Sequence, residues 1–234
     1  MTATAERVLY DLAGADPARR FSPYCWRTRM ALAHKGLNVE TIPWRFSDKA
    51  AIAFSGQGRV PVLVDAGKPI ADSWAIAVYL EETYPDRPSL FGGPSGLAVT
   101  RFVNAWADRV MGPGIAPLVI CDILARLDQR DHAYFRASRE KAFGRTLEEV
   151  MADRDTRVIG FRQALEPLRV VLRAQPFVGG DAPAYADYIP FGNLQWARCI
   201  SPFPLLEADD PILAWRDRLL DAFGGLARDV PAYD

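Results

Sequence analysis

The stretch Ser22-Pro23-Tyr24-Cys25 carries the side chains best suited to chemistry, at the start of a predicted helix. Ser22 suits the N-cap position, and Pro23 suits the first helical position that follows it. The pKa of a serine hydroxyl is too high for Ser22 to attack readily as an alkoxide. The hydroxyl can instead donate a hydrogen bond to a bound anion, and the positive potential at the helix start would strengthen that attraction.

The elements that must position these residues alternate between strand and helix. A buried strand is predicted at 7–12, before the loop that leads to Ser22. Trp26 and Met30 share one face of the helix after Ser22, and Gly36 marks the end of that helix. The remaining predicted elements are a strand at 39–44 whose Pro43 indicates a sheet edge, a weak helical segment at 47–54, strands at 60–65 and 69–71, and a helix beginning at Asp72-Ser73. The order is therefore βαβαββα.

The rest of the chain is predicted to be all-helical. A linker rich in Pro and Gly, 87–96, separates a predicted domain at 1–86 from one at 97–234. Apolar spacing predicts a long helix from Val99, interrupted by the Gly and Pro residues of 111–117. Further predictions are a capping box at 146–149 within a charged stretch, a helix at 161–172 with a kink or late start at Pro167, and helices at 184–199 and 211–223.

Three short motifs stand in an order that resembles the glutathione S-transferase family: Ser22-Pro23-Tyr24-Cys25, Val60-Pro61 and Asp72-Ser73. The resemblance spans the chain. It implies a thioredoxin-like α/β domain with a mixed sheet, followed by an all-α domain, and glutathione as co-substrate. It also implies that the peptide bond before Pro61 is cis and that the Val60 backbone pairs with the cysteinyl unit of glutathione. Asp72 would take the γ-glutamyl ammonium, while Ser73 and the free N–H groups of its helix would bind the carboxylate.

Ser22 is the predicted catalytic residue. Glutaredoxin-type redox enzymes have a reactive cysteine at this position, whereas here the bound glutathione would bring the thiol. A hydrogen bond from the Ser22 hydroxyl to that sulfur would favour thiolate over thiol. Two residues are alternatives. Cys25 could support thiol–disulfide exchange if it were exposed, and Tyr10 lies on the first strand, although the long loop at 13–21 disfavours it.

Other residues are predicted to contact the far ends of the two substrates. Lys49 and Arg59 are candidates for the glycine carboxylate of glutathione, with Arg45 as a further alternative. The broken helix should lie over the thiol site and help to form an apolar pocket for an aromatic second substrate. The residues predicted to line it are Tyr24, Trp26, Met111, Ile115 and Leu118. Met111 and Ile115 could equally pack in the interface between the domains.

Longer stretches look like the bacterial β-etherases of lignin breakdown and their fungal relatives. Examples are S-P-Y-C-W-R-T-R-M-A-L-A-H-K-G from Ser22 and D-S-W-A-I-A-V-Y-L-E-E-T-Y-P-D-R-P-S-L-F from Asp72. In that branch the serine matching Ser22 is the assigned catalytic position. The implied reaction is attack of glutathione thiolate on the carbon that bears an aryl ether, with release of a phenol. Cys25 is a departure from what is associated with the etherases.

Composition and charge exclude several classes of partner. The 234 residues carry a formal net charge of −1, which gives no field to attract nucleic acid or an anionic membrane. No apolar run approaches the ~20 residues that span a bilayer. The N-terminus lacks a signal-peptide pattern, so a cytoplasmic location is expected. Three widely spaced cysteines and two histidines show no metal-ligand spacing, so no metal cofactor is expected. The family resemblance implies a homodimer.

The sequence therefore favours a glutathione-dependent transferase or etherase acting on hydrophobic aromatic electrophiles, and it does not decide between these two activities. Two alternatives remain open. One keeps the fold without the catalysis, as a carrier of glutathione or of hydrophobic ligands, or as a regulatory protein. The other is a glutathione-linked thiol reductase that uses Cys25, which a serine in the attacking position disfavours.

Overall fold

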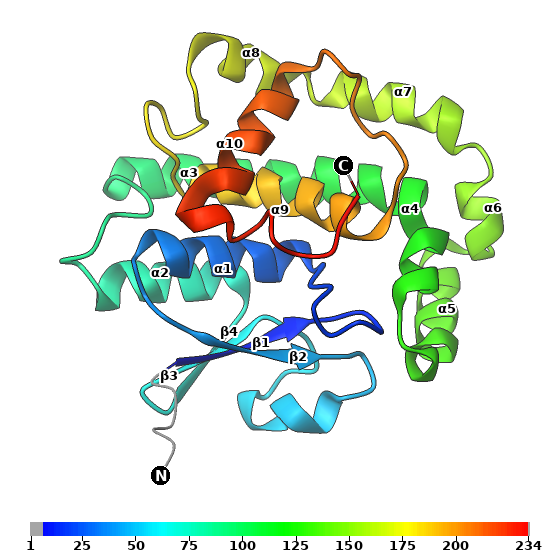
Figure 1. Cartoon of the computed structure of the whole chain (residues 1–234), viewed down its shortest axis with the longest axis horizontal. Helices are drawn as coiled ribbons and strands as arrows, with labels where there is room; N and C mark the ends of the chain where they lie inside the picture. Colours follow the sequence, from blue (N-terminus) through cyan, green and yellow to red (C-terminus); the bar gives the residue numbers. More distant parts are fainter. Residues whose placement is uncertain (1–6, 234) are drawn as a thin grey trace.

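The computed structural model describes residues 7–233 and contains a four-stranded mixed sheet covered by helices (Figure 1). Its strand order is β2-β1-β3-β4. β1 (Arg7–Leu12) is parallel to β2 (Glu40–Trp44) and antiparallel to β3 (Val62–Asp65), which pairs antiparallel with β4 (Lys68–Ala71). β2 is therefore an edge strand, and the prediction drawn from Pro43 is confirmed.

Two helices pack on one face of this sheet and a short helix lies on the other (Figure 1). α1 (Pro23–His34) and α2 (Ser73–Thr83) form the covered face, and the 3-10 helix η1 (Lys49–Ser55) lies below the sheet in that view. The chain leaves α1 through Gly36, whose φ of 64° is a left-handed conformation that glycine adopts without strain. The predicted order βαβαββα is confirmed, with η1 in place of the weak helical segment.

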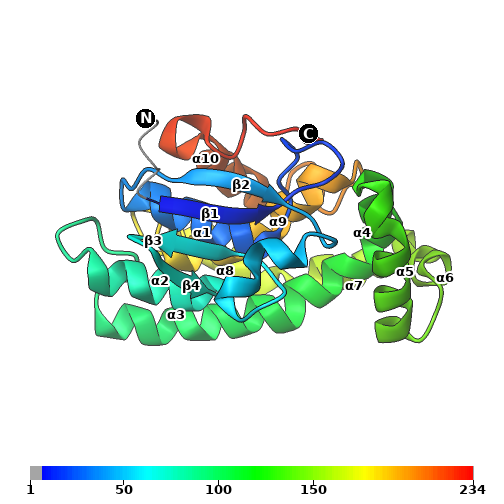
Figure 2. The same ribbon diagram turned by 90° about the horizontal axis from the view of Figure 1, so that it is seen from below.

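Every element described after α2 is a helix, as predicted. Figure 2 shows the first of them as one long rod along the side of the molecule, and α9 lies against α1. The elements are α3 (Pro94–Trp106), the π-helix η2 (Ala107–Met111), α4 (Gly112–Arg126), α5 (Gln129–Phe143), α6 (Leu147–Met151), α7 (Arg154–Ala164), α8 (Glu166–Ala174), α9 (Tyr185–Ile200) and α10 (Pro211–Gly225).

The long rod differs from the prediction in two ways. α3 begins at Pro94, inside the predicted linker, because proline is tolerated in the first turn of a helix. The predicted interruption at 111–117 is wrong, since α3 continues through η2 into α4. The π-helix shifts the hydrogen-bond ladder just before Gly112, so that Pro113 falls in the first turn of α4, where a missing N–H is tolerated.

Two local predictions in the helical part are confirmed. Thr146 and Glu149 form a capping box, in which the Thr146 N–H donates to Glu149 Oε2 at 2.9 Å and the Glu149 N–H donates to Thr146 Oγ1 at 3.3 Å. Pro167 lies in the first turn of α8, which gives the late start that its position predicted. The domain limits 1–86 and 97–234 stay a prediction, although every strand between residues 7 and 233 ends before Asp72.

Helix α9 holds together the two segments that carry the predicted chemistry. A Cβ on Gly192 would lie only 2.4 Å from the Pro23 carbonyl oxygen, so glycine allows α9 to contact the first turn of α1. The hydroxyl of Tyr185, at the start of α9, donates to the Ser73 carbonyl at 2.8 Å. The segments around Ser22 and Ser73 are thus fixed to one helix of the all-α part.

Candidate active site

Ser22 caps helix α1 at the end of a tightly held loop. Its Oγ accepts a hydrogen bond from the Cys25 N–H at 3.2 Å, and its side chain is almost fully buried. The loop before it is tied to β2 and α4 by hydrogen bonds from the Ala13 N–H to the Trp44 carbonyl and from the Ala15 N–H to the Arg126 carbonyl, each 2.8 Å. The predicted cap is confirmed, and the loop restricts where the hydroxyl can lie.

The Ser22 hydroxyl has capacity left after capping the helix. A hydroxyl has one donor hydrogen and two acceptor lone pairs. The cap uses an acceptor pair, so the donor hydrogen remains for another partner. The Ser22 side chain already acts on the neighbouring Cys25 thiol, because it lowers the pKa of that thiol against the larger opposing effect of burial. A bound thiolate would be a stronger acceptor than this neutral thiol, because hydrogen bonds to ions are stronger.

Cys25 is unsuited to redox chemistry in this structure. Its side chain is fully buried, and burial together with the nearby Asp11 carboxylate raises the pKa of its thiol well above the usual range. Asp11 is itself buried, with Arg20 and Arg29 at 3.5 and 3.7 Å from its Oδ2. Because the thiolate is the reactive form, Cys25 is both shielded from partners and held as a thiol.

Tyr10 faces away from the start of α1. Its ring packs against Phe54 of η1, with ring centroids 5.7 Å apart, and η1 lies on the face of the sheet opposite α1 (Figure 1). This packing disfavours Tyr10 as the donor to a ligand at Ser22.

The peptide bond between Val60 and Pro61 is cis, as expected. Val60 lies two residues before the start of β3, and within residues 7–233 no backbone hydrogen bond engages its N–H or C=O. An extended peptide could therefore pair with this backbone in the manner of an added strand.

Asp72 changes the expected arrangement at the start of α2. Its φ is 80°, and its Oδ1 accepts the N–H groups of Trp74 at 2.9 Å and Ala75 at 3.0 Å. The expectation that these N–H groups are free for a ligand is therefore corrected, because aspartate is itself a favoured cap. The Ser73 hydroxyl and N–H remain for a carboxylate. Asp72 Oδ2 forms no ion pair or hydrogen bond with the described part of the chain.

Tyr24 lies beside an ion pair that joins the two parts of the chain. Its side chain is 42% exposed, and the Arg27 guanidinium lies 4.6 Å from the ring centroid. Arg27 donates to Asp108 of η2 at 2.8 Å and to Asn104 of α3 at 3.0 Å. Burial raises the pKa of Tyr24, and the Asp108 carboxylate raises it further. No periodicity or motif in the amino-acid sequence pointed to Arg27 or Asp108.

The predicted carboxylate binders have different surroundings. Arg45 is already engaged, since it donates to the carbonyls of Gly14 at 3.2 Å and Ala15 at 3.1 Å. Its alternative role is therefore disfavoured. Lys49 is exposed, with its ammonium 4.4 Å from the centroid of Tyr134 on α5. Arg59 is exposed and contributes to the electrostatic surroundings of Tyr24.

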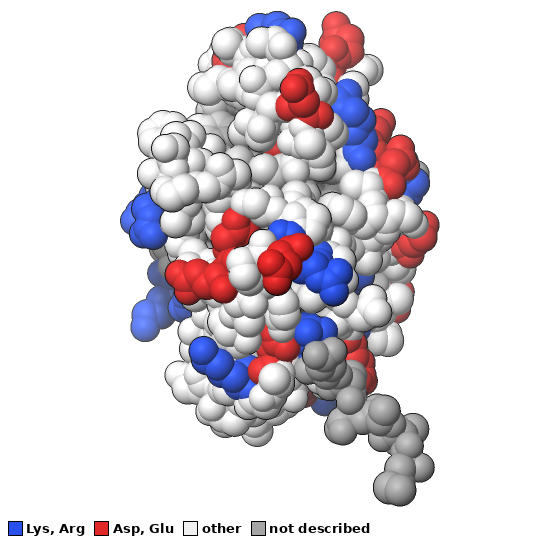
Figure 3. All heavy atoms as spheres, turned by 90° about the vertical axis from the view of Figure 1, so that its left-hand side faces the viewer, with Lys and Arg blue, Asp and Glu red and all other residues white. Residues whose placement is uncertain are grey.

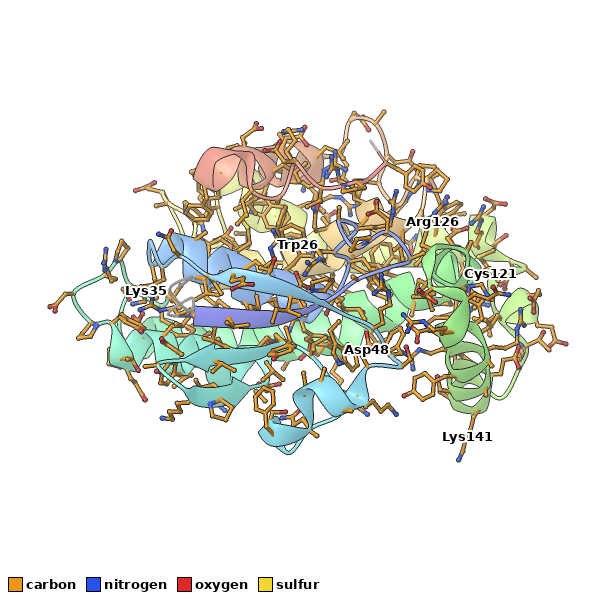
Figure 4. All side chains as sticks on the ribbon, turned by 60° about the horizontal axis from the view of Figure 1, so that its bottom comes forward. Trp26, Lys35, Asp48, Cys121, Arg126 and Lys141 are labelled. Atoms are coloured by element: carbon orange, nitrogen blue, oxygen red, sulfur yellow. The ribbon has the colours of Figure 1, made fainter. Side chains whose placement is uncertain are left out.

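Most of the side chains predicted to line the apolar pocket are buried, which contradicts that prediction. Met111, Ile115 and Leu118 are fully buried and Trp26 is 1% exposed, so of the predicted lining only Tyr24 is open to solvent. Figure 4 shows Trp26 between the sheet and the helices. The spacing 111, 115, 118 is that of a helix face directed at a core, and the unbroken rod turns this face inward. A hollow of about 550 Å³ lies elsewhere, along the segment between α9 and α10.

The described residues contain neither a cluster of metal ligands nor a membrane-spanning helix. Within residues 7–233 no group of three or more His, Cys, Asp or Glu side chains could hold a metal ion. No helix there is long and apolar enough to cross a membrane. Acidic and basic side chains are interspersed on the face seen from the left of Figure 1, which therefore has no patch of one sign (Figure 3).

Comparison with known sequences assigns the family. The family model for the glutathione S-transferase N-terminal domain matches residues 21–83, and the model for the C-terminal domain matches residues 98–220. The chain belongs to the glutathione S-transferase family. A probable glutathione S-transferase of rice (Oryza sativa) is 27% identical over 224 residues, covering 89% of this chain and 85% of the relative.

Known structures agree with the family assignment. A glutathione S-transferase of Ceriporiopsis subvermispora, solved in complex with glutathione, superimposes with a TM-score of 0.83 and 27% identity, covering 96% of this chain and 98% of the other. A glutathione transferase of Phanerochaete chrysosporium gives a TM-score of 0.82 and 25% identity, with coverage of 91% and 95%. The fold is thus a thioredoxin-like domain with a mixed sheet and an all-helical domain, as the sequence predicted.

Proposed function

We propose that this glutathione S-transferase activates glutathione through the Ser22 hydroxyl for attack on hydrophobic aromatic electrophiles. The observation that carries the proposal is the geometry of the cap. Ser22 Oγ accepts from the Cys25 N–H, so its own hydrogen is available to a sulfur placed at the positive end of α1. The hydrogen bond and the helix start both favour the charged thiolate over the thiol.

The glutathione tripeptide would lie across the starts of α1, β3 and α2. Its γ-glutamyl carboxylate would bind the Ser73 hydroxyl and N–H, and its ammonium would pair with Asp72 Oδ2. The Val60 backbone, which is without backbone partners in the described chain, would pair with the cysteinyl unit next to Pro61. Lys49 and Arg59, which form no ion pairs among the described residues, are the candidates for the glycine carboxylate.

The second substrate would lie beside Tyr24 instead of in the predicted pocket. Tyr24 offers a partly exposed ring, and Arg27 behind it is held by Asp108 and Asn104. Aromatic rings pack well against such a surface. In the etherase form of the reaction, the thiolate forms a C–S bond at the carbon that bears the aryl ether. The C–O bond breaks, and the aryl oxide leaves with the electron pair and takes a proton from water.

The protein is further proposed to be a homodimer. Val99 and Phe102 on α3 are 65% and 74% exposed, and large apolar side chains exposed next to each other are typical of interaction surfaces. Light scattering during size-exclusion chromatography would measure the mass in solution. A monomer at working concentrations would contradict this part of the proposal.

Catalysis is tested against a non-catalytic carrier by measuring binding and product formation separately. Calorimetry gives the affinity for glutathione, and mass spectrometry then identifies products formed from chlorodinitrobenzene and from a model β-aryl ether. If both substrates give a glutathione conjugate, and the ether also releases a phenol, the result supports the etherase activity. Conjugation of chlorodinitrobenzene alone supports a general transferase. Binding with no product above the buffer rate in either mixture would establish the carrier in its place.

A further inference from the structure

Helix α5 is fixed beside the segment that follows β2. The Asp131 carboxylate accepts the N–H groups of Phe46 at 3.1 Å and Ser47 at 2.8 Å. Phe46 also packs against the ring of Phe135, with centroids 6.0 Å apart. One face of α5 is therefore directed at the end of β2 and the start of η1, the region where Lys49 contacts Tyr134.

Arg139 lies on this face, and the described residues supply it no acidic partner. Its guanidinium lies 5.0 Å from the centroid of Phe135 and 5.9 Å from that of Phe46, and its side chain is partly buried. Its hydrogen-bond partner is the Ser138 hydroxyl at 3.4 Å, and no carboxylate of residues 7–233 is within ion-pairing distance. Arg136, less than one turn away, differs because it pairs with acidic residues on α5 and α6.

The groups around Arg139 add positive charge. Burial lowers the pKa of Arg139, and the nearby Arg59 guanidinium lowers it further, while Tyr134 opposes the change. Lys49 reaches the same helix, with its ammonium 4.4 Å from the centroid of the Tyr134 ring, and a Cβ on Gly58, the neighbour of Arg59, would lie 4.0 Å from Lys49 Cδ. Three cations, Lys49, Arg59 and Arg139, thus gather where the described chain supplies them no ion-pair partner. Such a cluster would be stabilised by a bound anion.

We propose that Arg139 binds an acidic group on the second substrate, so that the enzyme prefers aromatic electrophiles carrying a carboxylate. The inference rests on the proposed function. Lys49 and Arg59 belong to the thioredoxin-like part and serve the glycine carboxylate of glutathione, whereas Arg139 comes from the helical part. Its guanidinium can bind a carboxylate through two parallel hydrogen bonds, and the neighbouring rings suit an aromatic acid.

Arg139 takes no part in the bond-making step. The glutathione sulfur forms the bond to carbon, and the leaving group departs with the electron pair. Arg139 contacts the substrate at a distance from the reacting atoms. It is a specificity residue, and its effect should appear in affinity and KM for acidic substrates.

The test compares two stable conjugates that differ in one group, S-benzylglutathione and S-(para-carboxybenzyl)glutathione. Calorimetry on the full-length protein would measure both affinities, together with that of glutathione. Wild type should bind the carboxylated conjugate about tenfold more tightly than the benzyl conjugate, the lower end of what a charged hydrogen bond contributes. Arg139→Gln should abolish that preference, and Arg139→Lys should retain part of it.

Lys141→Gln is the matched control. It removes the same charge from the same helix at an exposed side chain that points away from the body of the molecule (Figure 4). This variant should keep the preference for the carboxylated conjugate. Thermal melts of all variants show whether each remains folded, and Arg139→Lys supplies the comparison if Arg139→Gln does not.

Several results would overturn the inference. No preference in wild type, or an equal loss in Lys141→Gln, would mean that Arg139 has no specific role. Arg139→Gln could instead weaken the binding of all three ligands equally. If it does not weaken the binding of glutathione ethyl ester, in which the glycine carboxylate is blocked, then Arg139 binds the glycine carboxylate of glutathione. If folded wild type binds neither glutathione nor either conjugate, the proposed function itself fails and the inference falls with it.

Discussion

Replacing Ser22 by alanine removes one hydroxyl that has two separate roles. The Oγ atom accepts the Cys25 N–H at 3.2 Å and so caps α1, and its hydrogen is proposed to stabilise the glutathione thiolate. Loss of a serine cap costs about 1 kcal/mol of stability. Loss of a hydrogen bond to an ion costs about 1.5–3 kcal/mol, and only the thiolate form of bound glutathione suffers this loss.

The loss of the hydrogen bond to the thiolate can be expressed as a shift in the pKa of the glutathione thiol. One pKa unit corresponds to about 1.36 kcal/mol, so Ser22→Ala should raise the pKa of bound glutathione by about 1–2 units. An ordinary thiol pKa of about 8.5 leaves roughly 3% thiolate at about pH 7, whereas a pKa lowered to about 7 gives roughly half. The variant should therefore bind glutathione but ionise it only at higher pH, with a matching upward shift in the pH–rate profile.

The assay is the ultraviolet absorbance of the thiolate, recorded across pH with glutathione at saturation. Thr146→Ala is the control, because it removes another helix cap at about the same cost in stability but far along the chain. The control should leave the thiol pKa unchanged, and Ser22→Thr, which keeps a hydroxyl, should restore most of the shift. The reasoning is refuted if wild type and Ser22→Ala ionise bound glutathione at the same pH.

Three further predictions concern the structure around the site. Gly192→Ala should lower stability by about 2 kcal/mol, and Tm by about 4–8 °C, because its Cβ would meet the Pro23 carbonyl; calorimetry would measure both, and an unchanged Tm would contradict the packing. Cys25 should resist a thiol reagent until the protein unfolds, and native Cys25→Ser should keep its transferase activity; rapid labelling would contradict the buried thiol. Glu81→Gln should cost about 3 kcal/mol near neutral pH, because it leaves the buried Lys35 ammonium, 2.6 Å from Glu81, without its anion. Burial raises the pKa of Glu81, but hydrogen bonds from Leu90 N–H and Lys35 outweigh this effect and leave the pKa below the usual 4.5. The cost of Glu81→Gln should therefore shrink as the pH falls through that lowered pKa. A cost that chemical denaturation shows to be independent of pH would refute the assignment.

The elements with strong local signals were predictable. Ser22-Pro23 starts α1 because the serine hydroxyl satisfies a free N–H and proline needs none, and the capping box at Thr146 forms for a similar reason. The strands follow from short apolar runs bounded by turn residues. The region at 111–117 was predicted wrongly, because a π-helix at 107–111 that no residue pattern predicts brings Pro113 into the first turn of α4, and the helix continues through Pro117.

Part of the candidate site could also be read from the sequence. The cap at Ser22 followed from the local Ser-Pro signal, the cis bond before Pro61 was implied by the family resemblance, and both are present. The lining of the second-substrate site could not be read in the same way. Met111 and Ile115 have the spacing of any apolar helix face, and only the packing of the rod against the body of the molecule turns them inward.

The sequence by itself determined the order of the elements, the caps that begin α1 and α2, and the family to which the chain belongs. These depend on interactions between residues a few positions apart, which the order of the side chains encodes directly. Only the tertiary structure decided that Asp72 occupies two N–H groups of its helix and that Cys25 is buried in the core. It also decided that Arg139 of α5 packs on Phe46 and Phe135, where the described residues supply no acidic partner. Burial and charge pairing depend on which distant segments meet, and that is settled only when the helices pack on the sheet.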